Sequence, residues 1–93
     1  MLCSSFLPGS INYTMGDIMN EFDQRYIELG LKIAYYRKRA GLTQEELAEK
    51  IGISPGYLSQ VETPSCIQPI SLKTLFLLAD TFGITPSQLL EGL

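Results

Sequence analysis

Start and stop signals for short helices recur along the chain, and they constrain its fold more than any other feature. Hydroxyl side chains suited to capping a helix N-terminus precede four apolar segments: Thr43, Ser54, Ser71 and Thr85. Pro55 and Pro86 follow two of these caps at the first helical position, where proline is tolerated. Gly52 and Gly83 stand where two of the helices should end. Because no alternating strand pattern competes with these signals, the sequence predicts an all-α fold.

Between these signals, apolar residues recur at the three- and four-residue steps of a helix face. The first helical pattern starts at Asn20 and ends before Gly41, and Gly30 leaves open whether residues 20–28 join it or form a separate helix. We therefore predict a bundle of five helices with a possible extra turn or helix at its start. The expected core positions are Phe22, Tyr26, Leu29, Ile33, Tyr36, Leu47, Ala48, Ile51, Leu58, Val61, Leu72, Leu75, Phe76, Ala79, Phe82, Leu89 and Leu90.

A length of 93 residues fits one compact domain. Residues 1–19 show no clean period and are rich in Ser, Asn, Thr, Gly and Pro, so we predict a poorly ordered tail followed by a domain over 20–93. No apolar run approaches the ~20 residues that cross a bilayer, and the chain start lacks the charge pattern of a secretory signal. The two cysteines, Cys3 and Cys66, are distant in sequence, which predicts free thiols and a cytoplasmic protein.

Composition argues against catalysis and cofactor binding. The chain has no histidine, which removes the commonest general base and the commonest metal ligand. Two distant cysteines supply too few ligands for a structural metal, and no glycine-rich phosphate loop is present. We therefore expect no enzymatic activity, no metal and no cofactor.

Charge is distributed unevenly along the chain. The net charge of −3 resides in residues 1–28, and residues 29–93 carry equal numbers of basic and acidic side chains. The dense basic cluster of this second part is Arg37-Lys38-Arg39. A neutral domain is unusual for a nucleic-acid binder, because such modules are commonly basic.

The segment from Gln44 to Glu62, QEELAEKIGISPGYLSQVE, has the pattern of a helix, a tight turn and a second helix. Ala48 is small where the two helices must approach, and Gly52 can adopt a positive φ at the corner. Leu58 and Val61 anchor the second of these helices on the core, which turns its other side outward. That geometry matches a helix-turn-helix, whose second helix can enter the major groove of DNA.

From about Leu29 to Leu90 the chain resembles the XRE/lambda-repressor-like helix-turn-helix family. The matching segments are LGLKIAYYRKRAGLTQEELAEKIGISPGYLSQVE and SLKTLFLLADTFGITPSQLL. The resemblance implies a five-helix bundle that binds double-stranded DNA sequence-specifically, usually as a homodimer on a two-fold site. It further implies a transcriptional regulator, with repression as the expected mode.

The resemblance also assigns residues to DNA contact. Gln44, at the start of the second helix, matches a position that contacts a backbone phosphate. The side of the third helix that reads bases corresponds to Ser54, Pro55, Gly56, Ser59 and Gln60. Gln60 is the strongest candidate, because its amide can pair bidentately with adenine.

Six further positions carry expected roles. Arg37 and Glu62 match positions that form an ion pair between the first and third helices in some phage repressors. The Tyr57 hydroxyl can bind a phosphate, or its ring can cover the edge of the core. Lys73, two residues past a helix cap, can pair with a phosphate near that helix N-terminus. The two basic residues after Arg37 are either phosphate contacts or surface charges that compensate the helix dipole.

The chain departs from the family pattern between the third and fourth helices. That segment reads ETPSCIQPIS and carries no charge after Glu62, where the family often has a basic turn against the DNA backbone. Few phosphate contacts predict a shallow dependence of DNA affinity on salt. The alternative is an antitoxin-like or protein-interaction module with the same fold and weak DNA binding, which would fit a neutral surface.

Overall fold

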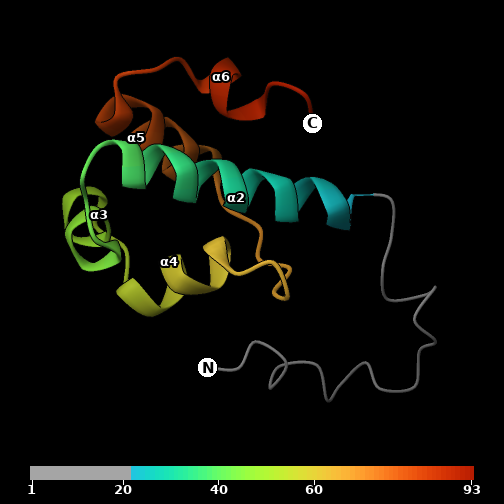
Figure 1. The fold of residues 1–93 in the computed structure, drawn as a ribbon, viewed down its shortest axis with the longest axis horizontal. Coiled ribbons are helices and arrows are strands. Elements are labelled where there is room, and N and C mark those ends of the chain that lie inside the picture. The colour runs from blue at the N-terminus through green and yellow to red at the C-terminus, as the bar shows by residue number, and fades with distance from the viewer. Residues whose placement is uncertain (1–21) are drawn as a thin grey trace.

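The computed structural model describes residues 22–93, and this part of the chain folds into five helices without a strand (Figure 1). The helices are α2 (Asp23–Arg39), α3 (Gln44–Ile51), α4 (Pro55–Glu62), α5 (Leu72–Phe82) and α6 (Pro86–Leu90). The predicted all-α, five-helix architecture is confirmed. The predicted tail over residues 1–19 lies outside the described residues. Among the described helices, none combines the length and apolar character that a membrane span requires.

The predicted caps define the helix boundaries. At α3, the Thr43 hydroxyl accepts from the Glu46 backbone N–H at 3.0 Å, and the Glu46 carboxylate accepts from the Thr43 N–H at 2.9 Å. The Ser54 hydroxyl caps α4 by accepting from the Tyr57 N–H at 3.0 Å. Gly52 ends α3 with φ of 78°, a left-handed conformation that a side chain would disfavour. The corner between α3 and α4 is therefore specified locally by the sequence.

Helix α2 runs unbroken through Gly30, which answers the question that the sequence left open. A Cβ atom built on Gly30 would stand 1.9 Å from the backbone carbonyl oxygen of Val61 in α4. The glycine therefore lets the backbones of α2 and α4 cross in direct contact, and its role is packing rather than interruption of the helix.

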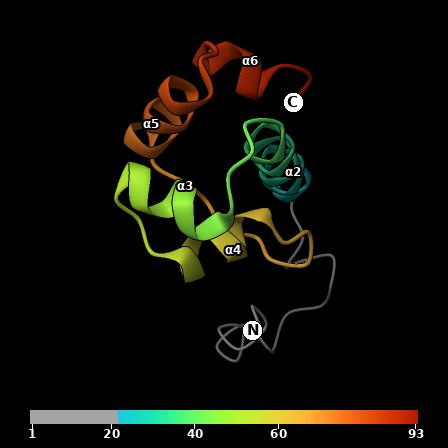
Figure 2. The same ribbon diagram turned by 60° about the vertical axis from the view of Figure 1, so that its left-hand side comes forward.

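The core lies where α2 crosses the remaining helices. Figure 2 views α2 nearly end-on, with α4 on one side of it and α5 and α6 on the other. The residues that form one buried apolar cluster are Leu29, Ile33, Leu47, Ala48, Ile51, Leu58, Val61, Leu75, Leu78, Ala79 and Leu89. Every helix contributes to this cluster, so the position of α4 is fixed by the whole bundle.

Several predicted core positions are wrong. Leu72 is 66% exposed, Phe76 49% and Leu90 44%, whereas Leu78, which the spacing did not select, is 1% exposed. Because α5 is apolar around most of its circumference, the three- and four-residue spacing alone could not select its inner face. At the start of α2, Phe22 and Tyr26 are also exposed, although they continue the stripe of Leu29 and Ile33.

The prediction of free thiols is wrong at Cys66. This residue is disulfide-bonded and 4% exposed, between the end of α4 and the start of α5. Cys3 lies outside the described residues. Cysteine usage therefore gives no support to a reducing compartment.

Candidate nucleic-acid interface

Helix α4 has one side locked into the core and one side facing outward. Leu58 and Val61 are 1% and 6% exposed, and both belong to the buried cluster. Ser54, Pro55 and Gly56 are exposed at the start of the helix. Ser59 and Gln60 are half-buried and lie on the side away from Leu58, as the 100° step of a helix requires. Gly56, Ser59 and Gln60 therefore share one surface of α4, and Ser54 and Pro55 stand at its N-terminal end.

This outer surface is hollowed beside the helix. A depression of about 350 Å³ is lined by Gly56, Ser59, Gln60, Thr63 and Cys66. Three of these residues belong to α4, and the last two belong to the segment that follows it. The absence of a side chain at Gly56 leaves its backbone accessible, and a Cβ placed there would meet nothing within 4 Å.

The inner side of α4 is held by a buried ion pair with α2. Arg37 Nε lies 2.8 Å from Glu62 Oε2, and Arg37 Nη2 donates to Glu62 Oε1 at 3.0 Å. The third guanidinium nitrogen, Arg37 Nη1, donates to the carbonyl oxygen of Leu42 at 2.8 Å, in the turn before α3. One side chain of α2 thus fixes both the end of α4 and the entry into α3.

Gln44 extends the same network. Its amide Nε2 donates to Glu62 Oε1 at 3.0 Å, which ties the first residue of α3 to the last residue of α4. Gln44 is half-buried, and its amide retains a second N–H beyond the one given to Glu62. Intramolecular bonding therefore orients this side chain.

Gln60 is oriented by a residue that sequence reasoning did not select. Gln68 Nε2 donates to Gln60 Oε1 at 2.7 Å, from the segment between α4 and α5. The contact fixes the direction of the Gln60 amide and uses part of the acceptor capacity that pairing with adenine requires. No sequence signal could have found Gln68, because it lies outside the helices and follows no period.

Tyr57 serves the fold on the same side of the molecule. Its hydroxyl donates to the carbonyl oxygen of Pro69 at 2.8 Å, and its ring packs against the buried cluster. Partial burial raises the pKa of the Tyr57 hydroxyl above its ordinary value. The phenol therefore stays protonated near neutral pH and links α4 to the segment before α5.

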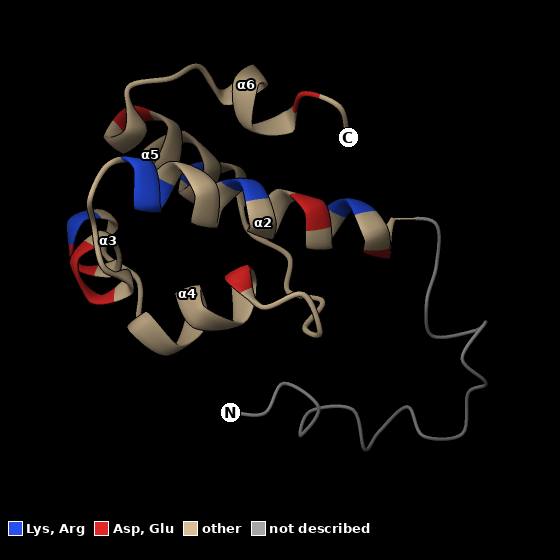
Figure 3. Ribbon diagram, in the orientation of Figure 1, with Lys and Arg blue, Asp and Glu red and all other residues tan. Residues whose placement is uncertain are grey.

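Charge is sparse on α4. Figure 3 shows no blue on the ribbon of α4 and one red residue, which the helix sequence PGYLSQVE identifies as Glu62. Glu45 and Glu46 occupy the first turn of α3, and the exposed Lys73 stands in the first turn of α5. The two basic residues at the end of α2 after Arg37 are exposed as well. Any contact with a polyanion here must depend more on shape and hydrogen bonds than on charge.

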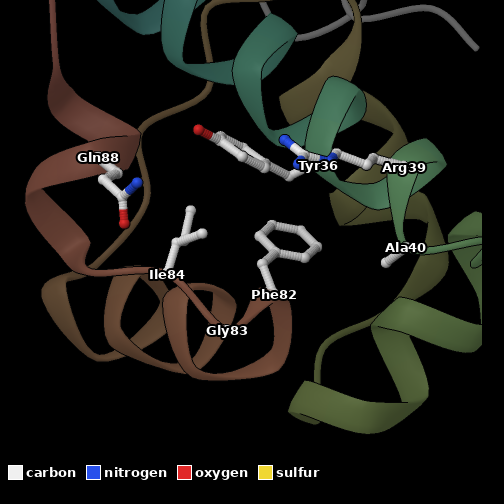
Figure 4. A pocket seen from close by; sticks show the side chains of 7 residues that line it. All are labelled: Tyr36, Arg39, Ala40, Phe82, Gly83, Ile84 and Gln88. Carbon is white, nitrogen blue, oxygen red and sulfur yellow. The ribbon is translucent and has the colours of Figure 1, made fainter.

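A second hollow lies on a different face. Figure 4 shows its lining, which comes from the end of α2 and from the region of α5 and α6. It has a volume of about 360 Å³, with Tyr36 and Phe82 stacked beside it at 5.8 Å between ring centroids. None of its lining residues belongs to α3 or α4, so it is separate from the surface around Gln60.

Two short helices joined at a tight corner, the second with an outward polar side, define a helix-turn-helix protein. A family model described as Helix-turn-helix matches residues 33–89. The chain belongs to this XRE-type helix-turn-helix family.

Solved structures extend the comparison. The clp gene regulator ClgR from Corynebacterium glutamicum is 30% identical, with a TM-score of 0.65 over 71% of this chain and 68% of that one. The master regulator for biofilm formation SinR, solved in complex with DNA, is 33% identical, with a TM-score of 0.61 over 68% of this chain and 98% of that one. These neighbours share the lambda-repressor-like bundle, and the match supports a DNA-binding transcriptional regulator.

One curated relative is a propionyl-CoA carboxylase regulator from Cereibacter sphaeroides, 37% identical over 60 residues. The match covers 64% of this chain but 13% of that protein. The chain therefore spans only a small part of the length of that regulator.

Proposed function

We propose that this protein is a transcriptional repressor that binds DNA sequence-specifically as a homodimer, with α4 in the major groove. The observation that carries the proposal is the division of α4, whose inner side is locked by Leu58 and Val61 while its polar side faces outward. A helix held in this way presents its side chains rigidly to the edges of base pairs. Residues 20–93 act as the DNA-binding unit.

The proposed contacts fall into two groups. Gln60 and Ser59 read bases, and the exposed residues Ser54, Pro55 and Gly56 allow the duplex to approach the start of α4. Gln44 and Lys73 bind backbone phosphates, Gln44 through the N–H that Glu62 does not use. Tyr57 supports α4 through Pro69, and the pair of Arg37 and Glu62 holds the helix in place.

Selection of bound sequences from a random DNA pool tests the proposal. We expect an enriched site with two-fold symmetry and half-sites separated by about 34 Å, one helical turn. Because the α4 surface is nearly uncharged, the logarithm of affinity should fall only shallowly with the logarithm of salt concentration.

The outcome that overturns the proposal is equally concrete. Absence of sequence enrichment at every salt concentration would reject DNA-dependent regulation. Co-purification of a stoichiometric protein in that case would favour the alternative of a protein-interaction module with the same fold.

A further inference from the structure

The segment between α4 and α5 carries a side chain that orients the candidate base-reading residue. Gln68 Nε2 donates to Gln60 Oε1 at 2.7 Å, so the acceptor end of the Gln60 amide is turned toward this segment. The two N–H groups of Gln60 Nε2 have no hydrogen-bond partner among residues 22–93. Gln60 therefore offers donors, rather than a free acceptor, to a ligand that meets α4.

Gln68 is itself held from both directions along the chain. Two residues before it, Cys66 is disulfide-bonded and 4% exposed. Directly after it, the carbonyl oxygen of Pro69 accepts from the Tyr57 hydroxyl at 2.8 Å. Because the backbone is fastened at these two points, the Gln68 amide stands beside Gln60 before a ligand binds. A contact that is already ordered loses little conformational entropy on binding.

The edges of base pairs in the major groove differ in their donors and acceptors. Guanine presents two acceptors, N7 and O6, whereas adenine presents the acceptor N7 and the donor N6. Bidentate pairing of a glutamine with adenine uses the amide oxygen and one N–H group together. At Gln60 the oxygen already accepts from Gln68, while both N–H groups remain available. The Gln60 amide therefore matches guanine better than adenine.

We propose that Gln68 is a specificity-determining residue, which turns the Gln60 amide so that it selects a G·C pair instead of an A·T pair. Gln68 acts through Gln60 and is a positioning residue. The inference rests on the proposed DNA binding and deepens it, since it names the base pair that this position reads. Arginine and lysine are the usual partners of guanine, and α4 contains neither. The paired amides take their place.

Selection of bound sequences from a random DNA pool, repeated with variants of the full chain, tests the inference. Gln60→Ala identifies the base pair that Gln60 reads, because preference at that position disappears. There the wild type should enrich G·C over A·T about tenfold. Gln68→Ala frees the Gln60 oxygen, so this preference should fall several-fold. Wild-type enrichment of A·T, or an unchanged G·C preference in Gln68→Ala, would overturn the inference.

Gln68→Glu should reverse the preference. A carboxylate only accepts, so the Gln60 amide should turn an N–H group toward position 68 and its oxygen toward the duplex. The amide then offers an acceptor and a donor side by side, which matches adenine, and A·T should be enriched over G·C about tenfold. Retention of the G·C preference in this variant would contradict the proposed role of Gln68.

Ser65→Glu supplies a matched control for the added charge. Ser65 is exposed in the same segment, so this variant places a carboxylate near the duplex without changing the partner of Gln60. Both glutamate variants should bind DNA more weakly, because a carboxylate repels phosphate, but Ser65→Glu should keep the G·C preference. A reversal in Ser65→Glu as well would assign the effect to charge and reject the inference. Circular dichroism melting checks that each variant folds.

Hydrogen exchange of the side-chain amides, followed by nuclear magnetic resonance in the free protein, separates this inference from the proposed function. In the wild type, one N–H group of Gln68 should exchange more slowly with solvent than either N–H group of Gln60. In Gln68→Glu, one N–H group of Gln60 should become slow instead. The opposite order in the wild type would overturn the inference and leave the regulator standing. The expected order without any selection of DNA sequence would reject the regulator, and the base preference with it.

Discussion

The two sides of α4 differ in how tightly they are specified. On the inner side, Glu62 receives three hydrogen bonds from Arg37 and Gln44, and the Val61 carbonyl lies against Gly30. On the outer side, a single contact between amide groups, from Gln68 to Gln60, orients the candidate base-reading residue. The inner side therefore fixes the position of the helix, while the outer side is free to vary in chemistry.

This division has a physical basis. A buried charge needs a partner, so changing one member of the inner network leaves an unpaired group in a poorly solvated place. The outer residues are exposed or half-buried, and their replacement changes little in the unbound protein. Substitutions on the two sides of one short helix should thus separate stability from recognition.

The largest effect is expected from Glu62→Ala. It leaves the Arg37 guanidinium buried without its carboxylate and should lower the free energy of unfolding by about 3–5 kcal/mol. Urea unfolding followed by circular dichroism measures this change. Glu62→Gln keeps the shape of the side chain and one acceptor oxygen, so it should lower the free energy of unfolding by less than Glu62→Ala. An equal decrease in the free energy of unfolding for the two variants would show that the Glu62 charge does not help to hold α4.

The second largest effect on stability is expected from Gly30→Ala. The added methyl group would collide with the Val61 carbonyl, so α2 and α4 must separate, at a cost of about 1–3 kcal/mol. Gly56→Ala is the matched control, because its Cβ meets nothing and alanine favours a helix by up to about 1 kcal/mol. Thermal melts of both variants should therefore shift in opposite directions. Similar destabilisation by both would argue that the close approach of α2 and α4 is unimportant.

On the outer side, Gln60→Ala should reduce discrimination at one base position by about 1–3 kcal/mol and leave the melting temperature unchanged. Gln68→Ala should weaken discrimination at the same position to a smaller extent, because it releases the Gln60 amide rather than removing it. Binding-site selection with each variant gives the comparison. An effect of Gln68→Ala at a different base position would contradict a positioning role.

The smallest effect is expected from Tyr57→Phe, which removes the hydrogen bond to Pro69 and should cost less than about 1 kcal/mol at pH 8. Burial raises the pKa of the Tyr57 hydroxyl in the folded state, so its contribution is complete below the unfolded pKa near 10. The contribution is lost as pH rises through the folded-state pKa. The difference in urea midpoint between wild type and variant should therefore shrink above pH 10. A constant difference across that range would exclude this linkage.

Sequence patterns were most reliable where the chemistry is local. The caps at Thr43, Ser54, Ser71 and Thr85 all accept the expected backbone N–H. The helical period does not identify the buried side of a helix that is apolar on more than one side, so it predicts Leu72 and Phe76 as core residues although both are exposed. The prediction at Cys66 is also wrong, because spacing along the chain says nothing about a disulfide.

By itself, the sequence determined the helices, their ends, the family and the two sides of α4, because capping, glycine conformations and helical period act over a few residues. The tertiary structure decided that Gly30 is a crossing point, that Gln68 orients Gln60 and that Leu31 and Tyr35 remain outside. These features depend on contacts between residues distant in sequence. Such contacts depend on the relative orientation of the packed helices. A local sequence pattern does not encode that orientation.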